Sequence, residues 1–108
     1  MWRTAIILAT VLLSIPAFAI DSKMQMTGAS FSNDCKWAEE SWIGFCNGYI
    51  QAVVDSIREE DRVCLPNGTT RTDIVTIAEK EIAASSQLRE MNAYDAVRSV
   101  LRNYYPCR

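Results

Sequence analysis

The residues of this chain with the greatest capacity for chemistry are its four cysteines, Cys35, Cys46, Cys64 and Cys107. No two of them have the C-x-x-C spacing of a metal knuckle, and the sequence has no histidine to complete a mixed zinc site. Four cysteines in a short chain that begins with a secretion signal predict two disulfides in an oxidising compartment. We therefore expect structural bridges rather than reactive thiols, and no bound metal.

The sequence offers little else for catalysis. Without histidine, the common Ser-His and Cys-His nucleophiles cannot be built. A hydrolase with two carboxylates needs them to face each other. The adjacent pairs Glu39–Glu40 and Glu59–Glu60 instead point to different helix faces near predicted helix ends. No glycine-rich phosphate loop or dinucleotide fingerprint is present. The chain is therefore predicted not to be an enzyme and to need no cofactor.

The first nineteen residues have the pattern of a cleaved signal peptide. Arg3 supplies a positive charge, an apolar run covers residues 5–13, and Ala17-Phe18-Ala19 is a small-x-small cleavage site. The run is far shorter than the ~20 residues of a membrane-spanning helix, so no membrane anchor is expected after cleavage. A buried N-terminal helix is the alternative. We predict a cleaved segment 1–19 and one mature domain, 20–108, in the periplasm.

The charge of the mature domain limits its partners. Loss of Arg3 with the signal leaves ten basic against thirteen acidic residues, a net charge of −3. No basic patch interrupts this balance, so neither nucleic acid nor an anionic membrane is an expected partner.

One strongly periodic segment predicts a long helix from about residue 39 to residue 59. Gly44 and Gly48 lie four residues apart on it, each at a cost of ~1 kcal/mol relative to alanine. Close approach of a second backbone is the favoured explanation, and a bound ligand is the alternative. The apolar face could be buried within the monomer or against a second copy. It is formed by Trp42, Ile43, Cys46, Tyr49, Ile50, Val53, Val54 and Ile57.

Weaker signals surround this helix. Residues 20–32 predict a flexible lead-in with room for a short helix at its end, Asn33 or Asp34 is the expected cap of the next helix, and Trp37 is an apolar anchor. Pro66-Asn67-Gly68 predicts a turn. Thr69 or Thr70, the latter with Asp73, predicts the cap of a third helix over residues 71–84. The residues expected to be buried on that helix are Ile74, Ile77, Ala78 and Ile82.

Residues 85–91 predict a polar connection, after which Asn92 can cap a last helix that Pro106 ends. We see no alternating strand pattern and no internal repeat, so the predicted fold class is all-α with four to five helices. The last helix is expected to turn inward Ala93, Val97, Val100, Leu101 and Tyr104.

Helix lengths rank the possible disulfide pairings. A helix over residues 39–59 is ~30 Å long, so Cys46 near its start is too far from Cys64 beyond its end for the ~7 Å that a bridge allows. An antiparallel pair formed by the last two long helices returns Cys107 to Cys64. We therefore predict Cys35–Cys46 and Cys64–Cys107, which contribute ~3 and ~4 kcal/mol by loop closure.

The ordered motifs Phe45-Cys46-Asn47-Gly48-Tyr49-Ile50, Cys64-Leu65-Pro66 with Gly68 and Thr70, and Tyr105-Pro106-Cys107 resemble the immunity proteins of type VI secretion amidase effectors, the Tai group and its relatives. The resemblance spans about residues 27–107. It implies a periplasmic, helical and often dimeric protein that occludes the cleft of a peptidoglycan amidase. It also implies a scaffold role for the motif residues, among them Gly48, Tyr49, Pro66 and Gly68.

If those motif residues form the scaffold, the contacts with an effector lie elsewhere. Glu59–Asp61 places negative charge at a predicted helix end, where the helix dipole disfavours it. A solvated end is the common explanation for such a run, and a contact surface is the other. The second candidate surface is the connection 85–90. The predicted partner-binding residues are Glu59, Glu60, Asp61, Ser86, Gln87, Arg89 and Glu90.

Two other functions fit a short, helical, disulfide-bonded periplasmic protein. An acid-stress holdase chaperone would expose apolar surface at low pH and protect many clients, whereas an immunity protein would hold one partner tightly. An accessory subunit of an envelope complex is the third possibility. Two bridges favour the rigid binder over the chaperone.

Overall fold

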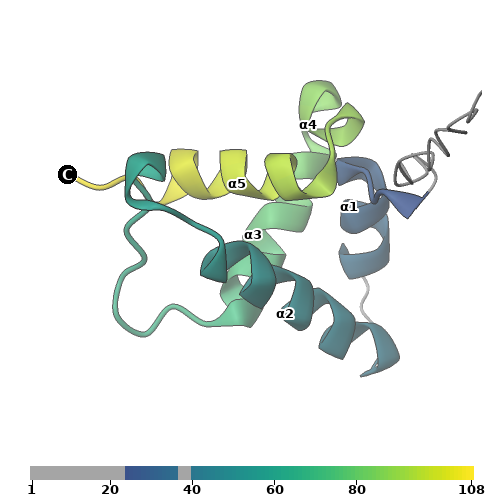
Figure 1. Cartoon of the computed structure of the whole chain (residues 1–108). Helices are drawn as coiled ribbons and strands as arrows, with labels where there is room; N and C mark the ends of the chain where they lie inside the picture. Colours follow the sequence, from purple (N-terminus) through teal and green to yellow (C-terminus); the bar gives the residue numbers. More distant parts are fainter. Residues whose placement is uncertain (1–23, 37–39) are drawn as a thin grey trace, which may run out of the picture.

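The computed structural model describes residues 24–36 and 40–108, with the side chains of residues 40 and 41 left undescribed. The predicted signal peptide, Trp37 and Glu39 therefore lie outside the described residues. The fold is all-α, as predicted, and the described residues form no strand (Figure 1). Its elements are α1 (Gly28–Lys36), α2 (Glu40–Asp55), the 3-10 turn η2 (Glu59–Asp61), α3 (Arg71–Ala83), α4 (Ser86–Glu90) and α5 (Ala93–Tyr104).

Helix α1 begins at the end of the predicted lead-in 20–32, where the sequence left room for a short helix, and it continues to Lys36. Thr27 begins it, since its Oγ1 accepts from the backbone N–H of Ser30 (3.1 Å). Asn33 and Asp34 lie inside the helix, so the prediction that one of them caps the next helix was wrong. α1 packs along α3, where Phe31 is fully buried and Ser32 Oγ donates to the carbonyl of Glu79 (2.7 Å). Through Phe31, this short helix therefore contributes a large buried side chain to the core.

Helix α2 is shorter than predicted and only partly buried. It ends at Asp55 rather than near residue 59. Cys46, Ile50 and Val53 face the core. The predicted apolar face of this helix was wrong at its start, because Trp42 and Ile43 are 42% and 46% exposed. Figure 1 shows that the first turns of α2 extend beyond the other described helices.

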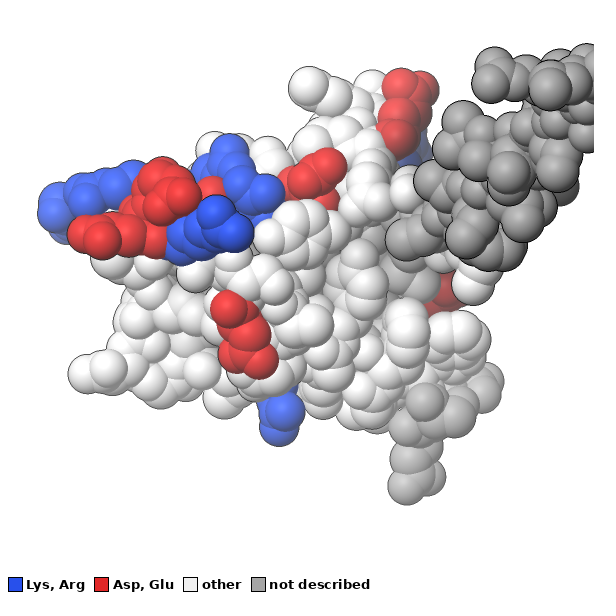
Figure 2. All heavy atoms as spheres, viewed as in Figure 1, with Lys and Arg blue, Asp and Glu red and all other residues white. Residues whose placement is uncertain are grey.

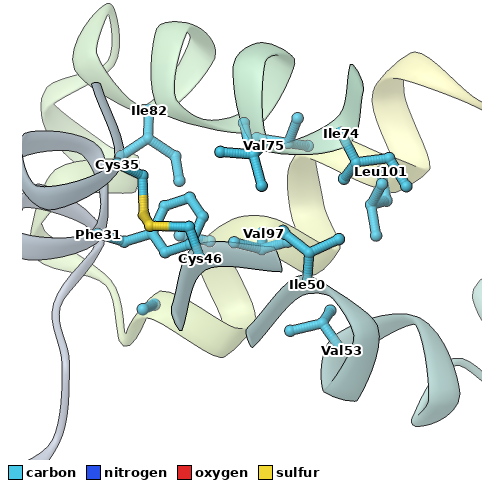
Figure 3. Packing of buried hydrophobic residues seen from close by; sticks show 14 residues of the cluster. Phe31, Cys35, Cys46, Ile50, Val53, Ile74, Val75, Ile82, Val97 and Leu101 are labelled. Carbon is cyan, nitrogen blue, oxygen red and sulfur yellow. A yellow bond between two sulfur atoms is a disulfide. The ribbon is translucent and has the colours of Figure 1, made fainter. Parts of the chain in front are cut away.

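The core lies where four helices converge (Figure 3). Phe31 from α1, Ile50 from α2 and Ile82 from α3 are fully buried there. Val97 and Leu101 from α5 close it, as the sequence predicted. Each helix supplies only a few apolar side chains, so the core depends on all four helices being held together.

Both disulfides have the predicted connectivity. Cys35–Cys46 joins the end of α1 to α2 with its Cα atoms 6.0 Å apart, and both cysteines are buried. Cys64–Cys107 joins the segment after η2 to the C-terminal tail, with Cα atoms 4.9 Å apart. Two backbone hydrogen bonds flank the second bridge: Cys64 N–H donates to Tyr105 O (2.8 Å) and Cys107 N–H to Arg62 O (3.0 Å).

The second half of the chain follows the predicted turn and caps. Gly68 has a φ of +87°, which only glycine adopts readily, so it completes the turn. Thr70 and Asp73 form the predicted capping box of α3, and Asn92 caps α5.

The second half also departs from the sequence prediction at three places. Ile77 on α3 is only half-buried, whereas its neighbour Val75 is buried. Tyr104, the last residue of α5, is 54% exposed rather than turned inward. Residues 85–91 contain a helix, α4, because Ser85 Oγ accepts from the N–H of Leu88 (3.2 Å) and so caps a new turn.

The glycines of α1 and α2 are in opposite environments. A Cβ atom on Gly28 would collide with the backbone carbonyl of Leu88, because the start of α1 crosses α4 at close range. A Cβ atom on Gly44 or Gly48 would meet nothing within 4 Å. The expected close approach of a second backbone to α2 is therefore wrong within the monomer, and it occurs instead at Gly28.

Two glycine substitutions should therefore change stability in opposite directions. Gly28→Ala is expected to lower the free energy of unfolding by about 1–3 kcal/mol, because the backbone of Leu88 must move to admit the methyl group. Gly48→Ala is expected to raise it by up to about 1 kcal/mol, because the site is open and alanine favours a helix. Urea unfolding of the disulfide-intact proteins measures both. A destabilised Gly48→Ala variant would contradict the open face of α2.

Candidate partner-binding surface

The acidic segment Glu59–Asp61 forms η2, a fixed turn rather than the end of a long helix. Helix α2 stops before it, where Ser56 Oγ donates to the carbonyl of Ala52 (2.7 Å). After the turn, Arg62 has a left-handed φ of 55° and donates its N–H to Glu59 O (3.1 Å). The backbone thus reverses and runs back toward the C-terminal tail.

Asp61 fixes η2 to α5. Its Oδ1 accepts from Arg98 (2.7 Å) and from Arg102 (3.3 Å), and its Oδ2 accepts from the backbone N–H of Arg58 (3.0 Å). The carboxylate side chain is only 9% exposed. The guanidinium of Arg98 also lies 5.3 Å from the centre of the Tyr94 ring, a cation–π distance. The carboxylate of Asp61 is therefore occupied by contacts within the monomer, which the sequence alone had not suggested.

These contacts change the acidity of both partners. The hydrogen bond from the backbone of Arg58, followed by the one from Arg98, lowers the pKa of Asp61 below its ordinary value. The hydrogen bond to Asp61 raises the pKa of Arg98 in turn. The Asp61 carboxylate therefore stays charged to a lower pH than an ordinary aspartate does.

The other two acidic residues of η2 remain available to a partner. Glu59 and Glu60 are exposed, and Glu60 stands at the rim of a depression of about 570 Å³ between η2 and α5. Figure 2 shows the densest group of charged side chains in this view at this end of the molecule, with single charges elsewhere. The depression is lined by Asp55, Ser56, Ile57, Arg58, Glu60, Asp61, Tyr94 and Arg98.

Helix α4 carries the second predicted contact region. Its half-buried residue, Leu88, faces the body and borders a smaller depression of about 310 Å³ that Tyr104 also lines. At the C-terminal end of α4, the N–H of Gly28 donates to the carbonyl oxygen of Met91 (2.8 Å). The predicted contact residues Ser86, Gln87, Arg89 and Glu90 are all exposed. α4 is thus a short helix that is attached to the body through Leu88 and Met91 and exposes four polar side chains.

The two predicted regions are not brought together. Figure 1 places η2 and α4 at opposite ends of α5. A partner that touches both must therefore extend along α5, whereas a partner with a compact contact area would use one of them.

The structure reveals a third exposed surface that the sequence prediction missed. Trp42, Ile43 and Phe45 at the start of α2 are 42%, 46% and 42% exposed. The Trp42 and Phe45 rings meet edge to face with centres 5.5 Å apart, and Phe45 lies 6.1 Å from Tyr49. Aromatic residues are enriched at protein interfaces. The sequence carried a sign of this exposed surface, because Phe45 is an aromatic residue outside the predicted apolar face and lies between Gly44 and Gly48.

The motif residues that were predicted to form the scaffold differ in how far they are buried. Tyr49 packs 5.5 Å from Phe31, at the edge of the core. Pro66 accepts from the N–H of Thr69 (3.1 Å) in the turn that Gly68 completes. Gly48 lies on the open face of α2.

Neither a metal site nor a membrane span is visible in the described part of the chain. No three His, Cys, Asp or Glu residues there are grouped so that they could hold a metal ion. No helix formed by these residues is long and apolar enough to cross a bilayer.

Comparison with known proteins agrees with a binding role. A family model described as Rap1a immunity proteins matches residues 27–107, a range that includes all five α-helices and both disulfides. No curated protein and no solved structure matches the chain.

The lowered pKa of Asp61 predicts how its contribution to the free energy of unfolding changes with pH. Because the folded pKa of Asp61 lies below the ordinary value of about 3.9, its stabilisation is complete above that pH and is lost as the pH falls through the folded pKa. The difference in unfolding free energy between wild type and Asp61→Asn should thus be constant above about pH 5 and shrink below about pH 4. Denaturant unfolding at a series of pH values measures it.

Glu59→Gln is the control for this prediction. Glu59 is exposed in the same turn and makes none of the contacts of Asp61, so its pH profile should stay near that of wild type. A difference for Asp61→Asn that grows toward acid pH would contradict the lowered pKa.

Proposed function

This chain belongs to the Rap1a immunity protein family, a type VI secretion family, and we propose that it neutralises one peptidoglycan amidase effector by binding it and occluding its active-site cleft. The family match over residues 27–107 is the observation that carries this proposal. Immunity by occlusion requires a binder and no chemistry of its own, so the proposed protein is not an enzyme and uses no cofactor.

The rigidity of the fold supports occlusion as the mechanism. An inhibitor that fills an enzyme cleft gains affinity when its contact surface is ordered before binding. Both predicted contact regions are ordered in this way. η2 is fixed through Asp61 to Arg98 and Arg102, and α4 is fixed through the backbone of Gly28 and the cap at Ser85.

The proposed compartment follows from the target. A peptidoglycan amidase acts on the cell wall, so its inhibitor must be present in the periplasm. The pattern of residues 1–19 supports export with cleavage after Ala19, which leaves the mature domain 20–108. The disulfides Cys35–Cys46 and Cys64–Cys107 are suited to that oxidising compartment.

We assign the effector contacts to the exposed polar residues of the two predicted regions. At η2 these are Glu59 and Glu60, which can pair with basic side chains on the effector, while Asp61 holds the turn in place. At α4 they are Ser86, Gln87, Arg89 and Glu90, which alternate donors, acceptors and both charges on one small projection. The resemblance to often dimeric proteins adds a second copy of this chain to the proposed partners.

The first test is capture of the partner. The disulfide-intact protein, purified from the periplasm, should recover a single cell-wall amidase from supernatants of cells with active type VI secretion. It should also abolish the activity of that amidase on peptidoglycan at stoichiometric concentration. Recovery of many unrelated proteins, mainly after acid exposure, would instead identify a holdase chaperone and contradict the proposal.

Charge reversal tests the assigned contacts. Glu59→Lys with Glu60→Lys should weaken binding to the captured amidase about tenfold or more, equivalent to ~1.4 kcal/mol, because attraction to basic groups becomes repulsion. The paired change Arg89→Glu and Glu90→Lys tests α4 in the same titration.

Thr76→Lys is the matched control for both variants. It adds a positive charge at an exposed position of α3 outside the two regions, and the affinity should change less than about twofold. Unchanged affinity in either variant removes that region from the effector interface.

A further inference from the structure

Two Asn-Gly pairs occur in this chain, Asn47-Gly48 and Asn67-Gly68. In such a pair the side-chain amide can be lost without an enzyme, because glycine has no side chain to keep its backbone nitrogen from the asparagine Cγ atom. The reaction needs a peptide group that can rotate and whose N–H is not held in a hydrogen bond. The two pairs have the same local sequence, so a difference in reactivity between them must come from their surroundings.

The second pair lies in an exposed turn before α3. Thr69 donates its N–H (3.1 Å) and its Oγ1 (2.7 Å) to the carbonyl of Pro66, which places Asn67 and Gly68 at the two central positions. Both central residues are exposed, and Gly68 has a φ of +87°. Within the described chain, neither the Asn67 side chain nor the N–H of Gly68 has a hydrogen-bond partner. Little therefore resists rotation of the peptide group between them.

The first pair lies inside α2, where the backbone is held in place. Asn47 is half-buried and follows Cys46, which is buried and bridged to Cys35. The N–H of an interior helical residue such as Gly48 donates to the carbonyl four residues earlier. The reaction at Asn47 therefore requires local opening of α2 next to a disulfide.

We propose that Asn67 is a site of spontaneous deamidation in the folded protein, whereas α2 protects Asn47. The co-reactant is water. The backbone nitrogen of Gly68 forms a bond to Cγ of Asn67, and its proton passes through solvent to the side-chain nitrogen, which leaves as ammonia. One water molecule then hydrolyses the cyclic succinimide at either of its carbonyl groups, which gives aspartate or isoaspartate.

Either product changes the turn and leaves the core untouched. Aspartate takes the net charge of the whole chain from −2 to −3, since fourteen acidic residues then face eleven basic ones. It is a common turn residue, so the cap of α3 at Thr70 should persist. Isoaspartate adds one main-chain atom and so disturbs the hydrogen bonds between Thr69 and Pro66. The turn lies outside the residues assigned to the effector, so this inference does not depend on the proposed function.

Peptide mapping of the folded, disulfide-intact protein after prolonged incubation at mildly alkaline pH tests the assignment. Trypsin releases residues 63–71, in which Asn67 is the one asparagine, and residues 37–58, in which Asn47 is the one asparagine. Mass spectrometry distinguishes amide from acid, and a digest before incubation gives the background. The peptide 63–71 should convert at least about tenfold faster than 37–58, because α2 must first open.

The unfolded protein is the matched control. Reduced and alkylated protein in denaturant has neither the turn nor α2, and glycine follows both asparagines. The two peptides should then convert at rates within about threefold of each other, because only residual structure distinguishes them.

The charge of the intact protein gives a second measurement. Isoelectric focusing of the incubated samples should show a more acidic form that accumulates in wild type and in Asn47→Gln. The same form should be absent from Asn67→Gln, because glutamine does not form the succinimide.

Three outcomes would overturn the inference. They are equal conversion of the two peptides in the folded protein, faster conversion of residues 37–58, and an Asn67 that stays an amide while the unfolded control converts. The experiment uses no effector, so a failure of the proposed immunity function leaves its result unchanged.

Discussion

The buried disulfide between Cys35 and Cys46 holds α2 against α1 at the edge of the core, and the remaining packing depends on it. α1 has only nine residues, and a helix of that length is marginal without tertiary support. Its tertiary support comes from packing against α3 and α5, with Phe31 fully buried in the core. Because the bridge fixes α2 at Cys46, the turns of α2 before it extend outward and those after it, at Ile50 and Val53, line the core.

A second constraint acts at the other end of the molecule. Asp61 connects η2 to α5, and Cys64–Cys107 connects the following segment to the tail. The chain between α2 and α3 includes no α-helix, yet its position is set by these two connections. The ion pair and the disulfide thus have the same role here. Each gives a segment with few apolar residues a defined place, which a protein that recognises one partner by shape requires.

Charge is distributed unevenly over the described surface. The end formed by η2 and α5 is crowded with charged side chains, part of them paired with one another. α4 is a small polar projection with both charges. Residues 41–54 of α2 carry no charge, and Trp42, Ile43 and Phe45 among them are partly exposed. The three surfaces therefore differ in chemistry.

Local sequence determined α3 and α5, the caps at Thr70 and Asn92, the turn at Gly68 and, through helix length, both disulfides. Each of these depends on neighbouring residues or on chain distance, whereas the end of α2 and the helix α4 were not predicted. The ordered motifs indicated a type VI secretion immunity family, which the match to the Rap1a immunity proteins shows, whereas the narrower Tai group stays a prediction. Tertiary structure alone decided three things. It made α1 central, it gave Asp61 its partners on α5, and it exposed Trp42 and Phe45. A hydrophobic period shows which residues share a helix side, but burial depends on which other helix reaches that side, and only the packed fold settles that.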